Sequence, residues 1–354
     1  MDRLKAAFLG LCHLHPRSYM PHFESLDGVD VVAVADSNSE VLDGFTRDFP
    51  VRGYRDWRDM LEKEKLDIAV IFLPHVECPE AAEACAKRGI HLIVEKPMAA
   101  SASGVQRMIS AAKDAGVLLT APYLWRYHPV SRSMKRLVDE DTLGRVVGCE
   151  GRCAAGRLSR YIEGNAEWML TKALSGGGPM YNLGVHWIDL YRWILRDEVV
   201  EVVAKNVKVS EEYDIEDNSF ALLTFSKGAV VMLDISYTVP DSYPYGRDLS
   251  LSLRGTRGVL SWSPSFEGTV ETLFVCSDAE DYSSSPRRHL EFELAASPGY
   301  CGILGLEFLS DFCKCVRTRS EPSITGDDGL RALEVVEAIY QSAEAGRAVR
   351  LGQR

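Results

Sequence analysis

The sequence lacks any stretch long and apolar enough for a membrane-spanning helix, which needs about 18 or more apolar residues. The longest strongly apolar run, Ile68–Leu73, has only the length of a β-strand. The apolar segment Ala6–Leu11 continues directly into Cys12 and His13, without the small-residue cleavage site that follows a secretory signal. We therefore expect no targeting segment and interpret Ala6–Leu11 as part of a buried first strand.

Cys-x-x-Cys pairs are also absent, although the chain has nine cysteines. An odd number of cysteines without such pairs is typical of reduced thiols in the cytoplasm, and not of a disulfide framework. Cys313 and Cys315 lie two residues apart on a predicted helix, so their side chains point to different faces and do not favour a zinc site. We therefore expect a cytoplasmic protein without a metal ion.

Positive charge is the minority charge, since 40 Lys and Arg residues stand against 51 Asp and Glu residues, a formal net charge of −11. General nucleic-acid binders and proteins of anionic lipid surfaces need clustered basic side chains, so both classes of partner are disfavoured. A composition of 46% hydrophobic and 26% charged residues excludes a disordered chain. At about 150 residues per domain, the 354 residues suggest two domains.

Strands and helices alternate over the first third of the chain. Apolar runs of strand length are separated by amphipathic or Ala-rich stretches, which is typical of a parallel sheet covered on both faces. We predict strands at Leu4–Leu9, Asp30–Ala35, Leu66–Leu73, His91–Val94 and Val117–Ala121, with helices up to Leu26 and over Ser39–Phe49, Asp56–Glu64, Glu77–Arg88 and Ser101–Ala115. The pattern predicts a doubly wound α/β domain over residues 1–122, which would bind ligands beyond the carboxyl ends of its strands.

The remainder, residues 123–354, has a different character because its strands are not each followed by a helix. Candidate strands are Arg145–Arg152, Val199–Val209, Ser219–Phe225, Ala229–Tyr237, Leu249–Arg254 and Val259–Trp262. They predict a large antiparallel or mixed sheet with one covered face. Ser283–Arg288 is typical of a loop. Two helices, Ile303–Val316 and Leu330–Glu344, are expected to close the chain, the second after the capping-box pattern Thr325–Asp328.

The turn after the first strand reads Gly10-Leu11-Cys12-His13-Leu14-His15. A dinucleotide fingerprint needs Gly-x-Gly-x-x-Gly so that backbone amides can approach a diphosphate, and here only the first glycine is present. Asp36 ends the second strand, where a carboxylate can accept the ribose 2′-hydroxyl. It would repel a 2′-phosphate, which favours NAD over NADP. The alternative is that Asp36 only caps the next helix.

Two further motifs place proton-transfer groups at suitable positions. Lys96, in Glu95-Lys96-Pro97, follows the strand His91–Val94, and a partly desolvated lysine can act as an acid or a base. A Gly-Gly-Gly-Pro entry precedes a predicted helix on which Asn182 and His186 are four residues apart and share a face. A histidine is suited to alcohol–ketone chemistry at neutral pH, although a histidine in a helix is more often structural.

These motifs, with the C-terminal segments Thr325–Leu333 and Ser342–Gly346, resemble the Gfo/Idh/MocA oxidoreductase family, the glucose–fructose oxidoreductase and inositol dehydrogenase group. The resemblance follows the family's order through almost the whole chain. It implies an N-terminal NAD-binding Rossmann domain and a C-terminal α/β domain with a large open, mostly antiparallel sheet for substrate binding and oligomerisation. It also implies homodimers or homotetramers formed through that sheet, and a sugar, cyclitol or related polyol as substrate.

The resemblance implies roles for individual residues. Lys96 and His186 match the family's catalytic lysine and histidine, and Asn182 stands where many members have an acid. The expected cofactor site comprises Gly10, Cys12, His13, His15, Asp36, Pro74, His75, Glu95, Lys96 and Arg126. The expected substrate wall comprises Tyr123, Arg126, Trp168 and His186. Interdomain packing is the alternative role for the wall residues.

Three departures from the family pattern bear on activity. Asn182 cannot stabilise an imidazolium as a carboxylate would, Cys12 and His15 loosen the phosphate site, and Cys78 replaces a histidine that contacts the cofactor. The leading hypothesis is reversible hydride transfer between NAD and a secondary alcohol of a sugar or cyclitol. In this hypothesis Lys96 or His186 takes the hydroxyl proton.

Two other functions remain open at this stage. One is a lyase or glycosidase that oxidises its sugar transiently, with Tyr127 or His128 as an additional base. The other is a non-catalytic sensor of nucleotides or sugars, which the damaged glycine fingerprint and Asn182 motivate. Fold alone does not choose between them.

Overall fold

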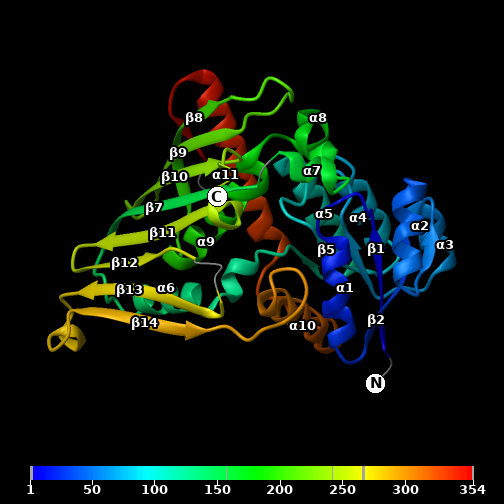
Figure 1. Ribbon diagram of the computed structural model, residues 1–354, viewed down its shortest axis with the longest axis horizontal. Coiled ribbons are helices and arrows are strands. Elements are labelled where there is room, and N and C mark those ends of the chain that lie inside the picture. The colour runs from blue at the N-terminus through cyan, green and yellow to red at the C-terminus, as the bar shows by residue number, and fades with distance from the viewer. Residues whose placement is uncertain (1–2, 157, 241, 265–267, 353–354) are drawn as a thin grey trace. The chain divides into compact units, whose positions relative to one another are not determined.

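The computed structural model describes residues 3–156, 158–240, 242–264 and 268–352. The chain divides into two compact units. The first unit comprises Met1–Leu124, Ser159–Gly177 and Ser297–Arg331, and the second comprises Trp125–Leu158, Gly178–Ala296 and Ala332–Arg354. Each unit is built around its own sheet (Figure 1).

The first unit contains the predicted parallel sheet, and its six strands follow the order β3-β2-β1-β4-β5-β6. The strands are β1 (Leu4–Leu9), β2 (Val29–Ala35), β3 (Arg52–Tyr54), β4 (Ile68–Ile71), β5 (His91–Val94) and β6 (Leu119–Thr120). The prediction of a doubly wound sheet is confirmed, and β3 is an additional short edge strand. The strand order reverses between β1 and β4, which makes their carboxyl ends the switch point where such sheets bind ligands.

Some helices of the first unit begin at residues whose side chains cap them. The helices of this unit are α1 (Pro16–Ser25), α2 (Ser39–Asp48), α3 (Trp57–Lys63), α4 (Cys78–Ala86), α5 (Ala102–Ala115), α7 (Ser159–Glu163), α8 (Lys172–Ser175) and α10 (Ile303–Thr318). Asn38, Asp56 and Ser101 each accept a backbone amide hydrogen bond in the first turn of α2, α3 and α5. Gly116 ends α5 with a left-handed φ of +66°.

The second unit contains a nine-stranded sheet in the order β14-β13-β12-β11-β7-β10-β9-β8-β15. Its strands are β7 (Val146–Ala155), β8 (Val199–Val207), β9 (Asn218–Phe225), β10 (Val230–Ser236), β11 (Arg247–Gly255), β12 (Gly258–Trp262), β13 (Val270–Ser277), β14 (Arg287–Glu293) and β15 (Val349–Arg350). Within the described part of this sheet, β7 and β10 pair in parallel and the other neighbouring strands pair antiparallel. The prediction of a large, mostly antiparallel sheet is confirmed.

The sequence-based strand prediction missed β13 and β14. The stretch Ser283–Arg288, expected to be a loop, also runs into β14, which begins at Arg287. The edge strand β14 alternates exposed and half-buried residues and is rich in charge, so it lacks the apolar run by which a buried strand is recognised.

One face of the nine-stranded sheet is covered by α9 (Val185–Leu195), and close packing at a glycine makes this possible. A Cβ at Gly151 on β7 would lie 2.4 Å from the Trp187 ring, so the indole packs directly on the backbone. The Tyr191 hydroxyl donates to the Glu150 carbonyl at 2.5 Å. Two further long helices are α6 (Pro129–Asp139) and α11 (Gly326–Ala345). The predicted capping box is present, because Thr325 and Asp328 exchange backbone and side-chain hydrogen bonds.

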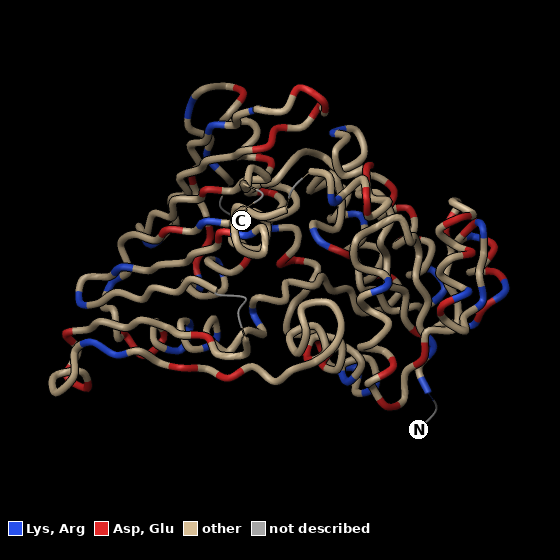
Figure 2. Tube along the Cα trace, in the orientation of Figure 1, with Lys and Arg blue, Asp and Glu red and all other residues tan. Residues whose placement is uncertain are grey.

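The opposite face of β8, β9 and β10 carries exposed apolar side chains: Val203, Phe220, Leu222 and Met232 are each 42–45% exposed. Basic and acidic residues are interspersed along the chain rather than gathered by sign on one element (Figure 2). No helix in the described part of the chain is long and apolar enough to cross a membrane.

Candidate active site

The loop after β1 approaches the end of β4 so closely that its first residue must be glycine. Gly10 has a φ of +88°, and a Cβ there would lie 3.0 Å from both the Leu73 amide nitrogen and the Phe72 carbonyl carbon. Any side chain would therefore meet backbone atoms as well as adopt a disfavoured conformation. This glycine holds together the two loops at the switch point of the first sheet.

Asp36 binds that loop through its carboxylate. Oδ2 accepts hydrogen bonds from the amides of Leu11 at 2.6 Å and Cys12 at 3.0 Å, and Oδ1 accepts from the Asn38 amide at 2.7 Å. Asn38, and not Asp36, caps α2. The Cys12 thiol lies 3.5 Å from Oδ1, and burial together with this carboxylate raises the pKa of the thiol to about 12. Asp36 is thus fixed at the carboxyl end of β2 as an acceptor.

The loop carries two imidazoles, of which His15 stands at the third glycine position of the fingerprint and His13 at a variable position. His13 is buried, and its Nδ1 accepts a hydrogen bond from the His15 amide at 3.2 Å, just before α1 begins. Complete burial holds the pKa of His13 well below its usual value. The His15 ring reaches back to the end of β5, where its Nδ1 lies 3.2 Å from Glu95 Oε2.

Glu95 and Lys96 are buried side by side at the carboxyl end of β5, each only 3% exposed. Glu95 Oε1 accepts a hydrogen bond from the Lys96 amide at 3.2 Å. Burial raises the pKa of Glu95, an effect that the nearby Lys96 charge opposes. The Lys96–Pro97 peptide is cis, and Met98 has a φ of +79°. A lysine and a carboxylate are thereby held at the switch-point edge of the sheet.

The loop after β4 adds a third imidazole. His75 Nδ1 lies 2.7 Å from the Ser175 carbonyl oxygen, and burial lowers the pKa of His75 to about 4. The neighbouring Pro74 is half-buried. Trp168 packs edge-on against His75, with ring centroids 4.9 Å apart, and donates from its indole nitrogen to the Cys12 carbonyl at 2.6 Å. Trp168 therefore belongs to the surroundings of the glycine loop.

Two buried imidazole nitrogens in this part of the first unit mark a place where a ligand can bind. His13 Nε2 and His75 Nε2 are buried and have no hydrogen-bond partner among the described residues. Leaving such groups unpaired costs free energy, so clusters of them mark places where a ligand completes the hydrogen bonding. The two imidazoles lie near the switch point of the sheet, where such sheets bind ligands.

The second unit carries the His186 motif. Residues Met180–Gly184 form a π-helical turn that leads into α9, and such turns are frequent at functional sites. The Asn182 amide nitrogen donates to the Tyr237 hydroxyl at 3.0 Å. His186 follows in the first turn of α9 and is 9% exposed. Asn182 and His186 therefore occur on one continuous helical segment, as predicted.

A glycine contact fixes the entry to this segment. A Cβ at Gly178 would lie 2.1 Å from the Glu216 carbonyl oxygen, so only glycine fits there. The Gly178 amide donates to the Tyr340 hydroxyl at 2.9 Å, and Tyr340 in turn donates to the Glu216 carboxylate. Close backbone packing thus explains the glycine at this position of the motif.

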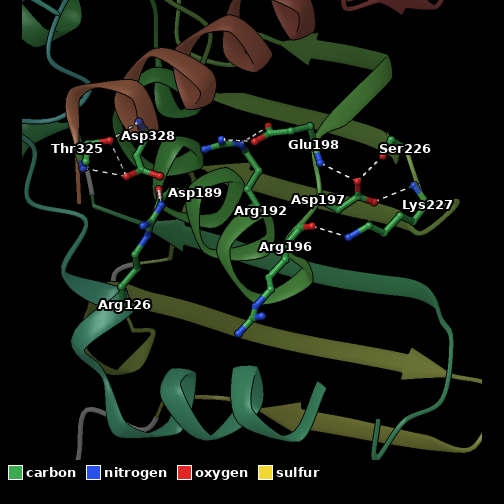
Figure 3. A network of polar contacts seen from close by, with 10 residues as sticks. All are labelled: Arg126, Asp189, Arg192, Arg196, Asp197, Glu198, Ser226, Lys227, Thr325 and Asp328. Carbon is green, nitrogen blue, oxygen red and sulfur yellow. Dashed lines mark hydrogen bonds and ion pairs between the residues drawn. The ribbon is translucent and has the colours of Figure 1, made fainter. Parts of the chain in front are cut away.

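Arg126 forms a buried ion pair with Asp189 of α9 (Figure 3). Its Nε and Nη2 donate to the two carboxylate oxygens at 2.8 and 2.5 Å, and the side chains are 8% and 1% exposed. Figure 3 shows further polar contacts at the other end of α9, where Arg192 pairs with Glu198 and Asp197 accepts from Ser226. Arg126 thereby joins the segment before α6 to the helix of His186.

His128 is occupied by a structural role. Its Nδ1 accepts the Val130 amide at 3.2 Å as the cap of α6, and its ring packs against Trp125 and Trp262. Burial lowers the pKa of His128 to about 3. These contacts do not favour His128 as the additional base of a lyase. In the described part of the chain no group of three or more His, Cys, Asp or Glu side chains could hold a metal ion.

Two family profiles match the chain, one for each type of sheet. The profile described as oxidoreductase family, NAD-binding Rossmann fold, matches residues 4–123, and the GFO/IDH/MocA C-terminal domain profile matches residues 131–261. The chain belongs to the GFO/IDH/MocA family. The resemblance seen in the sequence is confirmed, and residues 4–123 are an NAD-binding Rossmann fold.

Relatives of this GFO/IDH/MocA protein span almost its entire length. A myo-inositol 2-dehydrogenase of Thermotoga maritima is 28% identical over 93% of this chain and 94% of its own. A D-apiose dehydrogenase of Paraburkholderia graminis is 25% identical over 99% of this chain and 90% of its own. The crystal structure of the aldose-aldose oxidoreductase from Caulobacter crescentus, complexed with glycerol, superposes with a TM-score of 0.81 at 24% identity, over 99% of this chain and 100% of that one.

Sequence reasoning missed two residues of these sites. Tyr237, the last residue of a predicted strand, binds Asn182, and Tyr300 lies against His15 with ring centroids 3.8 Å apart. A tyrosine directly after a buried strand is a weak signal for a polar contact at the sheet edge. No sequence pattern pointed to Tyr300, because its loop is separated from His15 by most of the length of the chain.

Proposed function

We propose that this protein catalyses reversible hydride transfer between NAD and a secondary alcohol of a sugar, cyclitol or related polyol. The observation that carries the proposal is the buried Glu95-Lys96 pair at the carboxyl edge of the Rossmann sheet. In the same unit the buried nitrogens His13 Nε2 and His75 Nε2 have no hydrogen-bond partner among the described residues. A family membership shared with sugar and inositol dehydrogenases supports this substrate class.

In this proposal the dinucleotide binds along the carboxyl edge of the first sheet and supplies or accepts the hydride. Gly10, Cys12, His13 and His15 line its diphosphate, and Pro74, His75 and Glu95 lie at the nicotinamide end. The Asp36 carboxylate favours NAD, because its negative charge repels a 2′-phosphate. Among the described residues, Asp36 Oδ1 accepts the Asn38 amide and has a long contact from the Cys12 thiol, and a ribose hydroxyl can replace the thiol contact.

The catalytic groups of the proposal are Lys96, His186 and Asn182. Lys96 or His186 takes the proton of the substrate hydroxyl as hydride leaves the carbon, and the other hydrogen-bonds the same oxygen. Asn182 orients this part of the site through its amide, without the charge that a carboxylate would add to stabilise an imidazolium. Tyr123, Arg126 and Trp168 form the proposed substrate wall.

The decisive experiment combines binding with turnover. Thermal unfolding with NAD, NADH, NADP and NADPH should show stabilisation by NAD and NADH, since a ligand at about 100 times its dissociation constant adds about 2.7 kcal/mol. A screen of polyols and aldoses should then show reduction of NAD by absorbance. Lys96→Ala should abolish turnover, whereas Lys87→Ala, a change at an exposed lysine of the same domain, should not. Full turnover by Lys96→Ala would refute the assignment.

The exposed apolar face of β8–β10 supports a proposal of homodimers or homotetramers. A second copy of the chain would cover Val203, Phe220, Leu222 and Met232. We also retain the cytoplasm as the proposed location, because none of the nine cysteines, all within the described residues, forms a disulfide bond.

A further inference from the structure

His15 stands at the third fingerprint position, where the pattern expects glycine, and its ring has a defined direction. Its Nδ1 lies 3.2 Å from Glu95 Oε2, and the ring stacks on Tyr300 with centroids 3.8 Å apart and planes inclined by 27°. The side chain of His15 is 14% exposed, so it is more accessible than the Glu95 carboxylate at 4%. The imidazole thus covers a buried anion at the start of α1.

The loop that carries Tyr300 is fastened to α1 by polar contacts on both sides. The Tyr300 amide donates to the Ser18 carbonyl at 2.8 Å, and His22 Nε2 lies 2.9 Å from the Tyr300 carbonyl oxygen. Gly299, with a φ of +105°, allows this approach, since a Cβ there would lie 2.7 Å from the His22 ring. The orientation of His15 is therefore built into the fold of the first unit.

Titratable groups face His15 from each neighbouring segment of the first unit. Glu95, His13 and Tyr300 contact the His15 ring. Around them, Lys96 and His75 interact with His13, and Tyr19 interacts with Glu95 and Cys301. Complete burial keeps His13 and His75 neutral near pH 7, because it lowers the pKa of each imidazole. His15 is therefore the imidazole of this cluster that has both an acidic partner and access to a ligand.

We propose that His15 contacts the diphosphate of the dinucleotide and takes up a proton from solvent when the dinucleotide binds. The inference rests on the proposed function, because it requires a dinucleotide on this loop. Amide dipoles at the start of α1 favour an anion there. Independently, the His13 ring lies with its centroid 4.6 Å from that of His15, and its buried Nε2 has no hydrogen-bond partner among the described residues, which indicates a ligand beside the two rings. An imidazolium between Glu95 and the diphosphate is favoured by both anions.

Calorimetric titration of NAD in two buffers of different ionisation enthalpy tests the proposal at about pH 7. The wild-type protein should take up a fraction of a proton, up to about one per NAD bound, and His15→Gln should take up none. ADP-ribose, which keeps the diphosphate, should show the same uptake, whereas adenosine should show none. His289→Gln, a change at an exposed histidine of β14, should behave as wild type.

The pH dependence of affinity gives a second measurement that needs no variant. Wild-type affinity for NAD should weaken by about 10-fold as the pH rises from about 6 to about 8.5. The reason is that His15 loses its proton, and with it the charge-assisted hydrogen bond to the diphosphate. In His15→Gln the affinity should be flat over the same range. His15→Ala should show the same flat pH dependence as His15→Gln. Unfolding curves measured without ligand show whether each variant is folded.

The outcomes separate this inference from the proposed function. Binding of NAD without proton uptake, or with the same uptake in His15→Gln, overturns the inference and leaves the dehydrogenase proposal intact. Failure of every nicotinamide dinucleotide and of ADP-ribose to bind the wild-type protein overturns both.

Discussion

The side-chain amide of Asn182 donates a hydrogen bond to the hydroxyl of Tyr237 at 3.0 Å, which joins the π-helical turn before His186 to the end of β10. The sequence showed only that Asn182 replaces a carboxylate of the family, whereas the structure shows that its amide has a fixed partner. A neutral side chain held in this way can order the helix of His186 without changing its charge balance.

Asn182→Asp should shift the pH profile of alcohol oxidation. A carboxylate four residues before His186 on the same helical segment favours the imidazolium form of His186. Because the base must be unprotonated to accept the hydroxyl proton, the profile of kcat should move to higher pH. Asn182→Ala, which removes the Tyr237 contact without adding charge, should leave its position unchanged. An identical profile for the Asp variant would count against His186 as the base.

The buried pair of Arg126 and Asp189 should be far more important for stability than an exposed one. Asp189→Asn leaves the guanidinium buried beside a neutral group, and should cost about 3–5 kcal/mol of unfolding free energy in urea. The control is Glu140→Gln, which breaks the exposed Arg136 pair of α6 and should cost under about 1 kcal/mol. An equal loss of unfolding free energy in the two variants would show that burial does not make the Arg126–Asp189 pair more important for stability.

Acid sensitivity should depend on His128. Its folded-state pKa of about 3 lies below that of an exposed imidazole, so the unfolded chain binds the proton first as the pH falls. The contribution of His128 is therefore fully present above about pH 6.5 and is lost by about 1.4 kcal/mol per pH unit below it. His128→Asn keeps a capping side chain for α6 without titrating, and should flatten the decline between about pH 6 and 4. Urea unfolding at each pH measures both slopes, and parallel slopes would refute this role.

The apolar face of β8–β10 should be the contact between copies. Leu222→Glu places a charge at the centre of the exposed patch and should convert the assembly to monomers in analytical ultracentrifugation, because an unpaired buried charge is costly. Val270→Glu, at a valine on β13 that is 50% exposed against 44% for Leu222, is the control and should leave the assembly unchanged. A monomeric wild-type protein would contradict the oligomer proposal directly.

Local features of the sequence predicted most of the secondary structure. The parallel strands of the first sheet were recognisable because they are buried on both faces and read as continuous apolar runs. The capping box at Thr325–Asp328 was also correct, since it depends only on residues three positions apart. The edge strand β14 was missed because charged residues interrupt its pattern.

The sequence by itself determined the order of strands and helices, the α/β class, and the family, through short motifs whose chemistry is local. Only the tertiary structure decided what each motif contacts. In the structure Asn38 caps α2, Asp36 accepts hydrogen bonds from the loop after β1, and Tyr300 stacks on His15. Such contacts join residues far apart in the chain, where no spacing rule applies, and they arise only when the segments pack together.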